Sequence, residues 1–249
     1  MDPSAFAASL VVELAKKHGI TIDPKKPLEM YCPGCGKVPA SRPNQPCPAC
    51  TEKANRARWK ELIDRAWATV PKALSWVSFD EPDLGDWVTD DHAIERARAS
   101  VGAPLVTLVG PAGAGKTTLA LCVLHEFVQR GSRKGAKFHD RRMAANMLFT
   151  TAIDLVHARA EHPLGEREPP LVTRAERASV LVLDELGAVN DPHQTVFSIL
   201  HHRHANEAPT IVTTWMSALE VTRAYGGGIA RRLWQDGVVI EVRKKESGL

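Results

Sequence analysis

The sequence lacks any long hydrophobic segment. Its 249 residues are 44% hydrophobic and 24% charged, a composition typical of folded domains that are surrounded by water. No apolar run approaches the roughly 18–20 residues that a membrane-spanning helix needs. The N-terminus has no basic segment followed by an apolar one. We therefore expect no signal peptide, no membrane partner and a cytoplasmic location.

Charge of one sign is not in large excess, because 32 Lys and Arg residues face 29 Asp and Glu residues and the net charge is +3. This balance excludes a chain that is polycationic throughout. Residues 1–72 nevertheless hold twelve basic and seven acidic residues, a net of +5, which leaves −2 for the remainder. A second basic stretch consists of Arg130, Arg133, Lys134, Lys137, Arg141 and Arg142. Each patch fits either nucleic-acid contact or an ordinary solvated surface.

Cysteines are few, but four of the five form two close pairs in the pattern C-x₂-C-x₁₁-C-x₂-C. Two such knuckles can present four thiolates to one tetrahedral Zn²⁺. The predicted zinc ligands are Cys32, Cys35, Cys47 and Cys50. Disulfides are the alternative, but they fit poorly with a cytoplasmic chain. Because four thiolates close the coordination shell, we expect a structural zinc, whereas Cys122 lies in a predicted helix and is expected to be buried.

A complete phosphate-binding loop occupies residues 110–117, which read Gly-Pro-Ala-Gly-Ala-Gly-Lys-Thr. The apolar run 105–109 precedes it as a predicted strand, and a predicted helix follows it. The glycines let backbone N–H groups approach an anion, Lys116 supplies a charge for the β- and γ-phosphates, and the Thr117 hydroxyl can ligate Mg²⁺. The predicted nucleotide-binding residues are Gly110, Pro111, Ala112, Gly113, Ala114, Gly115, Lys116, Thr117 and Thr118.

A second nucleotide motif follows 68 residues after Lys116. Four apolar residues at 180–183 end in Asp184 and Glu185, the pattern of a Walker B strand. We expect Asp184 to lie near Mg²⁺ and Glu185 to polarise an attacking water. The Glu favours nucleotide hydrolysis over phosphoryl transfer to a small metabolite. A further strand ends in Thr213 and Thr214, either of which can contact the γ-phosphate or the water.

Apolar strand candidates alternate with helical segments from residue 104 onward, which predicts a parallel α/β sheet with helices on both faces. The predicted strands are 105–109, 147–151, 179–183, 209–213 and 237–242. The predicted organisation is a helical zinc-binding domain at 1–72, an acidic connector at 73–103 and an ATPase domain at 104–249. In the first domain we predict a short helix at 5–17 and a longer one that Thr51 caps and Pro71 ends.

A glycine-rich turn at 226–228 leads into Arg231 and Arg232. Such a pair can project a guanidinium toward a neighbouring subunit, where arginine stabilises the charge on a transferring phosphoryl group. Three histidines, His201, His202 and His204, stand together on a predicted helix. Their pattern fits a solvated helix end better than a metal site.

These elements together resemble the DnaC/IstB group of AAA+ ATPases, which comprises helicase loaders and transposition helpers. The matching segments cover roughly 104–243 and are the phosphate-binding loop, Phe149-Thr-Thr-Ala-Ile-Asp-Leu155, 181–187, Arg203, Thr-Ile-Val-Thr-Thr at 210–214 and 225–233. The resemblance implies an AAA+ core with a five-stranded parallel sheet in the order 5-1-4-3-2. Because seven residues follow the last predicted strand, we expect no C-terminal lid.

The resemblance also implies roles for particular residues. Arg232 matches the arginine finger, with Arg231 as the alternative, and Lys116, Asp184, Glu185 and Thr213 complete the predicted catalytic set. Trp215 departs from the family, which has Asn after the two threonines. Without a lid, a neighbouring subunit must complete each ATP site, so we expect self-association.

The first functional hypothesis is a helicase loader that binds the replicative helicase hexamer and single-stranded DNA and uses ATP to time loading and release. DNA is expected near 130–142 and the helix that starts at Thr151. The alternative is a transposition helper that binds DNA and a transposase; the four cysteines favour the loader. A metabolite kinase, or a zinc adaptor with an inactive nucleotide site, fits less well because the hydrolysis residues are all present.

Overall fold

The computed structural model describes residues 17, 31–37, 45–132, 144–163, 165–191 and 193–244. The predicted helix at 5–17, apart from Lys17, and most of the basic stretch 130–142 lie outside these residues. The chain divides into two compact units, 1–57 and 58–249, which we describe separately. The domain boundaries suggested at 72 and 103 remain a prediction. Within the described residues, no helix is both long and apolar enough to cross a membrane.

Helix α2 (Pro48–Trp67) contributes to both units, and its limits differ from the prediction. It begins at Pro48, so Thr51 lies inside the helix and donates its N–H to Cys47 O at 2.9 Å instead of capping. Proline suits the first helical turn because its missing N–H would have no partner there. The helix ends at Trp67, not at Pro71, because the Val70 N–H bonds to Trp67 O in a tighter turn.

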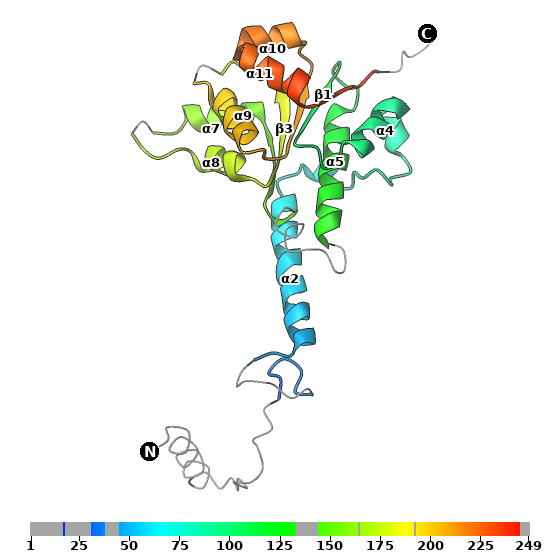
Figure 1. Cartoon of the computed structure of the whole chain (residues 1–249), viewed down its shortest axis with the longest axis vertical. Helices are drawn as coiled ribbons and strands as arrows, with labels where there is room; N and C mark the ends of the chain where they lie inside the picture. The colour runs from blue at the N-terminus through cyan, green and yellow to red at the C-terminus, as the bar shows by residue number, and fades with distance from the viewer. Residues whose placement is uncertain are drawn as a thin grey trace. The chain divides into compact units, whose positions relative to one another are not determined.

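The second unit contains a five-stranded parallel sheet in the order β2-β3-β4-β1-β5 (Figure 1), which confirms the predicted fold class and strand order. The strands are β1 (Leu105–Val109), β2 (Met147–Thr151), β3 (Val180–Leu186), β4 (Thr210–Thr214) and β5 (Val238–Glu241). Strand β4 separates β1 from β3, as expected. The phosphate-binding loop and the end of β3 therefore share one edge of the sheet.

Helices cover both faces of this sheet (Figure 1). One face packs against α5 (Lys116–Ser132), α4 (Asp91–Ala99) and the C-terminal part of α2. The other carries α7 (Ala152–Ala160), α8 (Pro170–Arg177), α9 (Thr195–Ala205), α10 (Ala218–Tyr225) and α11 (Gly227–Arg231). Strand β3 alternates between them: Val180 and Val182 face the first core, and Leu181 and Leu183 the second. Cys122 of α5 is fully buried, as predicted.

The acidic stretch 73–103 is folded against the first core. It contains α4 and the short α3 (Leu84–Trp87), which follow the turn η1 (Lys72–Leu74). Val77, Phe79 and Val88 are buried in the cluster that includes α5. These apolar residues are scattered among carboxylates, which is why the sequence alone suggests a connector.

Arg203 of α9 is completely buried and acts as a structural anchor. Its guanidinium donates to the Thr210 hydroxyl and to backbone carbonyls of α8 and of the approach to β4. Burial lowers the pKa of Arg203 to about 10. The N–H groups of the Arg203 guanidinium donate to the acceptors that surround it, so this side chain connects α8, α9 and the start of β4.

Candidate functional site

The phosphate-binding loop connects β1 to α5, and its glycines adopt backbone angles that other residues disfavour. Gly113 and Gly115 have φ of 74° and 89°. A side chain at Gly115 would meet Val88 Cγ2 at 2.6 Å and Trp87 O at 2.7 Å. The loop therefore needs glycine here both for its φ and because α3 approaches it closely.

Lys116 bends back over the loop, and its ammonium donates to Pro111 O at 2.7 Å. Partial burial lowers the pKa of Lys116, while the carboxylates of Asp184 and Glu185 oppose that shift. The side chain stands in the same cavity as both carboxylates. Its charge is thus placed between the loop and the end of β3.

Two hydroxyl side chains from different elements meet at Asp184, which is 5% exposed. The Thr117 hydroxyl, at the start of α5, donates to both carboxylate oxygens at 3.0 and 3.1 Å. The Thr213 hydroxyl, at the end of β4, donates to Asp184 Oδ1. The structure thus brings together the predicted Mg²⁺ ligands Thr117 and Asp184, and Thr213 adjoins them.

The backbone of Glu185 does not have the extended conformation of a strand. Its φ is 57°, and the β3–β4 register shifts between Leu183 and Leu186. Its N–H donates to Thr213 Oγ1 at 3.0 Å, and its side chain is exposed. A left-handed conformation is costly for glutamate, so strain is held at the carboxylate predicted to activate water.

The two threonines at the end of β4 are bonded differently. Thr213 links Asp184 to the Glu185 backbone, whereas the Thr214 hydroxyl donates to Leu186 O at 2.8 Å and accepts from Met216 N at 3.0 Å. Both residues line the same cavity. Of the two, Thr213 contacts the carboxylate that is predicted to sit near Mg²⁺.

A cavity of about 640 Å³ joins these groups. Its walls come from the phosphate-binding loop, the ends of β3 and β4, and the segment before β1. The lining residues are Leu74, Trp87, Ala112, Gly113, Gly115, Lys116, Thr117, Thr118, Asp184, Glu185, Ala188, Thr213, Thr214 and Trp215. The cavity is within the 300–1,000 Å³ that ligand sites usually have.

Leu74 and Trp87 are cavity residues that the sequence reasoning missed. Both come from the acidic stretch before β1, and Trp87 is 54% exposed with its ring 5.6 Å from that of Trp76. The available signal was that Trp76 and Trp87, two of the chain's few aromatic residues, lie in a stretch rich in carboxylates. Trp215 also lines the cavity and is 52% exposed, which indicates a site with open walls.

Arg231 and Arg232 lie away from this cavity. Arg232 begins the π-helical turn η2 (Arg232–Asp236) and lines a different cavity of about 240 Å³, together with Pro104 and Thr210 from the starts of β1 and β4. The 640 Å³ cavity, which includes the phosphate-binding loop, lies at the opposite ends of those strands. Neither arginine belongs to the set that meets at Asp184 of its own chain.

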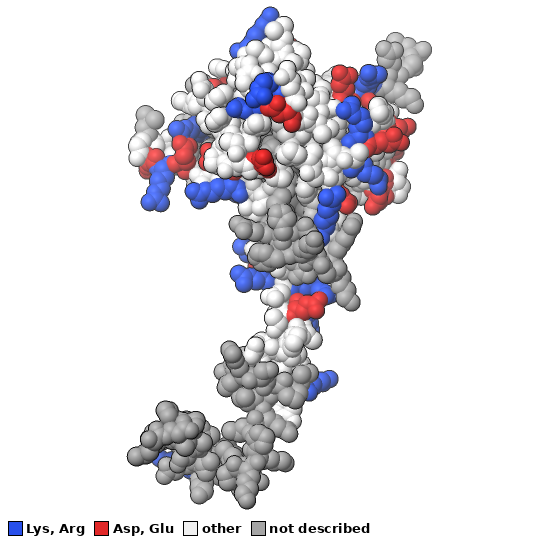
Figure 2. Space-filling view, in the orientation of Figure 1, with Lys and Arg blue, Asp and Glu red and all other residues white. Residues whose placement is uncertain are grey.

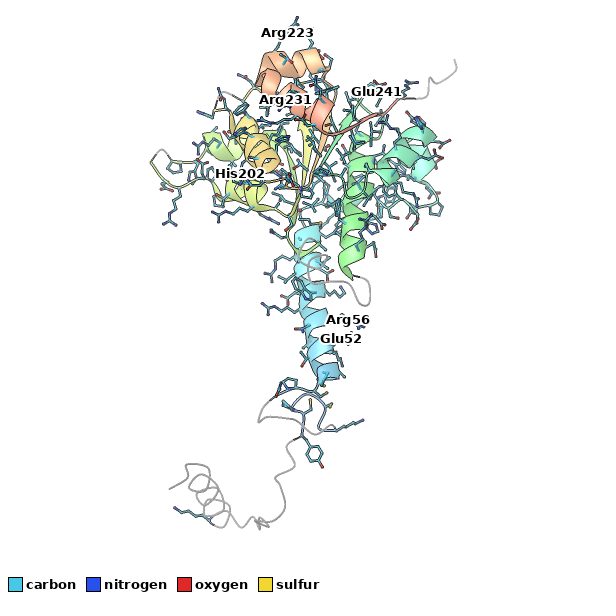
Figure 3. All side chains as sticks on the ribbon, in the orientation of Figure 1. Glu52, Arg56, His202, Arg223, Arg231 and Glu241 are labelled. Carbon is cyan, nitrogen blue, oxygen red and sulfur yellow. The ribbon has the colours of Figure 1, made fainter. Side chains whose placement is uncertain are left out.

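The two arginines have different partners. Arg231 donates to Asp236 at 3.0 Å, and Arg232 Nη2 lies 2.9 Å from His201 Nδ1. Figure 3 labels Arg231 on α11 and His202 on α9, two helices beside the smaller cavity. Among the residues that the structure describes, the three histidines of α9 join no metal-binding group.

The four predicted zinc ligands lie together in the first unit. The sulfurs of Cys32, Cys35, Cys47 and Cys50 are all within 4.8 Å of one another. The Cys35 and Cys47 sulfurs are 3.9 Å apart, and Zn–S bonds of about 2.3 Å in a tetrahedron place sulfurs about 3.8 Å apart. The four residues therefore fit a single Zn²⁺.

Backbone donors support this thiolate cluster. The N–H groups of Cys47 and Gly34 donate to Cys32 Sγ at 3.1 and 3.3 Å. The Cys47 contact chiefly lowers the pKa of Cys32 to about 6, against the opposing effect of burial. The neighbouring Cys32 and Cys47 sulfurs raise the pKa of Cys50 to about 12. Without a cation, the cluster thus favours the thiolate at Cys32 and disfavours it at Cys50.

No family model and no curated protein matches this chain. The solved structures that it resembles include the DnaC helicase loader, at 20% identity and a TM-score of 0.52, over 69% of this chain and 99% of that one. DnaI matches at 20% identity and a TM-score of 0.51, over 74% and 100% of the two chains.

A replication initiator DnaA bound to AMPPCP and single-stranded DNA matches at 17% identity and a TM-score of 0.51. That match covers 66% of this chain and 51% of the initiator, so the chain resembles only about half of the initiator. At such identities the likeness concerns the fold. The chain has an AAA+-like α/β fold similar to that of these solved structures, and a four-cysteine cluster lies near its N-terminus.

Proposed function

We propose that the protein is an ATPase of the helicase-loader type, which binds a replicative helicase hexamer and single-stranded DNA and uses ATP to time their assembly. The observation that carries this proposal is the meeting of Thr117, Asp184 and Thr213 in one cavity with Lys116. The likeness in fold to the DnaC helicase loader and to DnaI supports the choice of replication as the process.

The phosphates would bind to the N–H groups of the loop 110–117, with Lys116 turning from Pro111 O to the β- and γ-phosphates. Thr117 and Asp184 would hold Mg²⁺, which neutralises the developing negative charge when bound. Glu185, exposed at the cavity wall, would orient the attacking water. Thr213 would keep Asp184 and the Glu185 backbone in register.

The base of the nucleotide would lie against Leu74 and Trp87. They are the apolar wall of the cavity on the side of the segment before β1, and Trp87 offers an exposed ring. A purine stacks on an aromatic face with a gain of about 1–3 kcal/mol. The segment 73–103 would therefore belong to the ATP site.

Arg232 would serve as the arginine finger for a neighbouring copy. It lies at the opposite strand ends from its own phosphate cavity, so it would act on another chain's ATP. Arg231 is the weaker candidate because Asp236 already neutralises its charge at 3.0 Å. The imidazole next to Arg232 carries no negative charge, so that guanidinium stays available for a phosphate.

The four-cysteine cluster would hold a structural Zn²⁺ and stabilise the first unit, which we propose as the part that binds the helicase. Single-stranded DNA is proposed to contact the basic stretch at 130–142. Figure 2 shows basic and acidic side chains interspersed over the visible face of the second unit. That mixture gives no support for DNA binding on this face.

The test of the loader assignment is capture of partners by Glu185→Gln, which should bind ATP without hydrolysing it. Tagged variant and wild-type chains would be incubated with host lysate, ATP and Mg²⁺, and the retained proteins identified by mass spectrometry. A replicative helicase enriched by the variant would support the proposal. A transposase in its place would favour the transposition-helper alternative and contradict the loader assignment.

A further inference from the structure

We infer that His201 is a positioning residue for the Arg232 guanidinium when that group acts on a neighbouring copy. The inference rests on the proposed role of Arg232. It adds a residue of this chain that no motif in the sequence indicates, because the two positions are 31 residues apart. The contact joins α9 to η2, and it is the observation from which the inference starts.

Among the described residues, the Arg232 side chain makes one polar contact, which it makes through Nη2. Its Nη2 lies 2.9 Å from His201 Nδ1, and its Nε is buried without a hydrogen-bond partner among the described residues. Arginine is only a donor, so His201 Nδ1 must be the acceptor and the imidazole must be neutral. The guanidinium is therefore oriented by a single hydrogen bond to a neutral group. Within the part of the chain that the structure describes it makes no ion pair, although Glu207 and Asp236 line the same cavity.

His201 is itself held in place by the helix beneath it. Its ring stacks on Phe197 one turn earlier, with planes 3° apart and centroids separated by 6.0 Å. Two residues later, buried Arg203 anchors α9 to α8 and β4 through backbone carbonyls. The acceptor nitrogen is thus presented from a fixed element, although the His201 ring is exposed.

The base of the finger is equally constrained. The Thr107 hydroxyl of the interior strand β1 donates to Leu233 O at 3.0 Å, and Arg231 and His204 both contact Asp236, at 3.0 and 3.3 Å. These contacts fix the π-turn η2, a local irregularity often found at functional sites. These contacts hold the backbone of η2 but not the side chain of Arg232, whose rotation is restricted by the contact with His201.

A neutral acceptor suits this task better than a carboxylate. A carboxylate would form a charge-assisted pair that competes with the phosphoryl oxygens for the same donors. An imidazole restricts the rotamers of Arg232, which lowers the entropy that this side chain loses on reaching the neighbouring site. The hydrogen bond to a neutral imidazole can then break when the guanidinium binds phosphate. His201 therefore acts through Arg232 and does not itself contact the nucleotide.

The test compares MgATP turnover of the full-length chain carrying His201→Ala, His201→Asn or Arg232→Ala. Removing a finger arginine lowers kcat by about 10³-fold or more. His201→Ala should lower kcat by about tenfold with the KM for ATP unchanged. His201→Asn should recover most of the loss, because its amide oxygen takes the place of Nδ1 as acceptor. His202→Ala, at the exposed neighbouring position, is the matched control and should behave as wild type.

Mixed assemblies locate the effect in the donating subunit. A chain with Lys116→Ala supplies Arg232, and a chain with Arg232→Ala supplies the ATP site, so activity on mixing requires a finger in trans. Adding His201→Ala to the Lys116→Ala chain should lower the recovered activity by about tenfold, as before. Adding it to the Arg232→Ala chain should change nothing.

The outcomes separate the inference from the function on which it rests. If Arg232→Ala is inactive and His201→Ala turns over as wild type, the positioning role is wrong and the finger stands. If His201→Asn is as impaired as His201→Ala, the acceptor role is wrong. If Arg232→Ala hydrolyses MgATP at the wild-type rate, the proposed arginine-finger role is wrong, and the role of His201 is wrong with it. The melting temperatures of all variants would show that each is folded.

Discussion

At the scale of single residues, the hydroxyl of Thr213 links the carboxylate that we propose as a Mg²⁺ ligand to the backbone of the glutamate that we propose activates water. It donates to Asp184 and accepts from Glu185 N, whereas Thr214 bonds only to backbone groups of Leu186 and Met216. The sequence leaves these two threonines as alternatives. The hydrogen bonds favour Thr213, and this preference can be measured.

Thr213→Val should lower kcat for ATP hydrolysis by about 10²-fold while ATP affinity changes less than threefold, because one preorganised hydrogen bond at the site is lost. Thr214→Val is the matched control. It should instead lower the free energy of unfolding by about 1–3 kcal/mol, since two backbone groups lose a buried partner. Turnover and urea unfolding of both variants would check this. Equal kinetic defects in the two would contradict the assignment.

Trp87→Ala should weaken ATP binding by about tenfold or more, because a stacking surface worth about 1–3 kcal/mol is removed. Titration of nucleotide against the purified chain by calorimetry would measure the affinity. Trp76 packs on Trp87 but does not line the cavity, so Trp76→Ala should have the smaller effect. An unchanged affinity in Trp87→Ala would place the base elsewhere.

At the scale of secondary-structure elements, the sequence predicts that the sheet forms, but it does not predict where every strand ends. Strands 105–109 and 147–151 match their predicted bounds, since buried parallel strands read as unbroken apolar runs. Strand β3 continues past 183 to Leu186 because a register shift carries the chain through Asp184 and Glu185. The pattern of apolar residues along the chain does not indicate such a register shift.

The parts of the site that sequence could not provide depend on contacts between distant segments. Lys116, Thr117 and Asp184 belong to motifs with characteristic residue patterns, so the order of residue types along the chain is enough to identify them. Leu74 and Trp87 reach the cavity only because 73–103 packs on α5. The pairing of His201 with Arg232 depends on how α9 meets η2, and no short motif encodes it.

Substitution of Arg203 measures how much its contacts between α8, α9 and β4 stabilise the fold. Arg203→Met should lower the free energy of unfolding by about 3 kcal/mol or more, because the carbonyls of Ala175, Ala178 and Pro209 lose a buried donor. The exposed Arg174→Met in α8 is the control and should change stability by less than about 0.5 kcal/mol. Denaturant unfolding would compare them, and equal stabilities would refute the anchoring role.

At the scale of the whole molecule, the two units should respond independently to loss of metal. We expect one Zn²⁺ per chain, measured by elemental analysis, and its loss in Cys32→Ser or with a strong chelator. Proteolysis within 31–37 should then accelerate, because the cluster joins this segment to the residues at the start of α2. ATP affinity of the second unit should stay unchanged. A metal-free wild-type chain with the same resistance to proteolysis would contradict a structural zinc.

We propose that the 640 Å³ cavity is an ATP-hydrolysing site in which Glu185 activates water. The most direct test is MgATP binding and turnover of wild type and Glu185→Gln, with DNA present. We expect affinities within about threefold of each other and a kcat lowered by about 10²-fold or more in the variant. Turnover of Glu185→Gln at the wild-type rate, or a wild-type chain that binds no ATP, would contradict it.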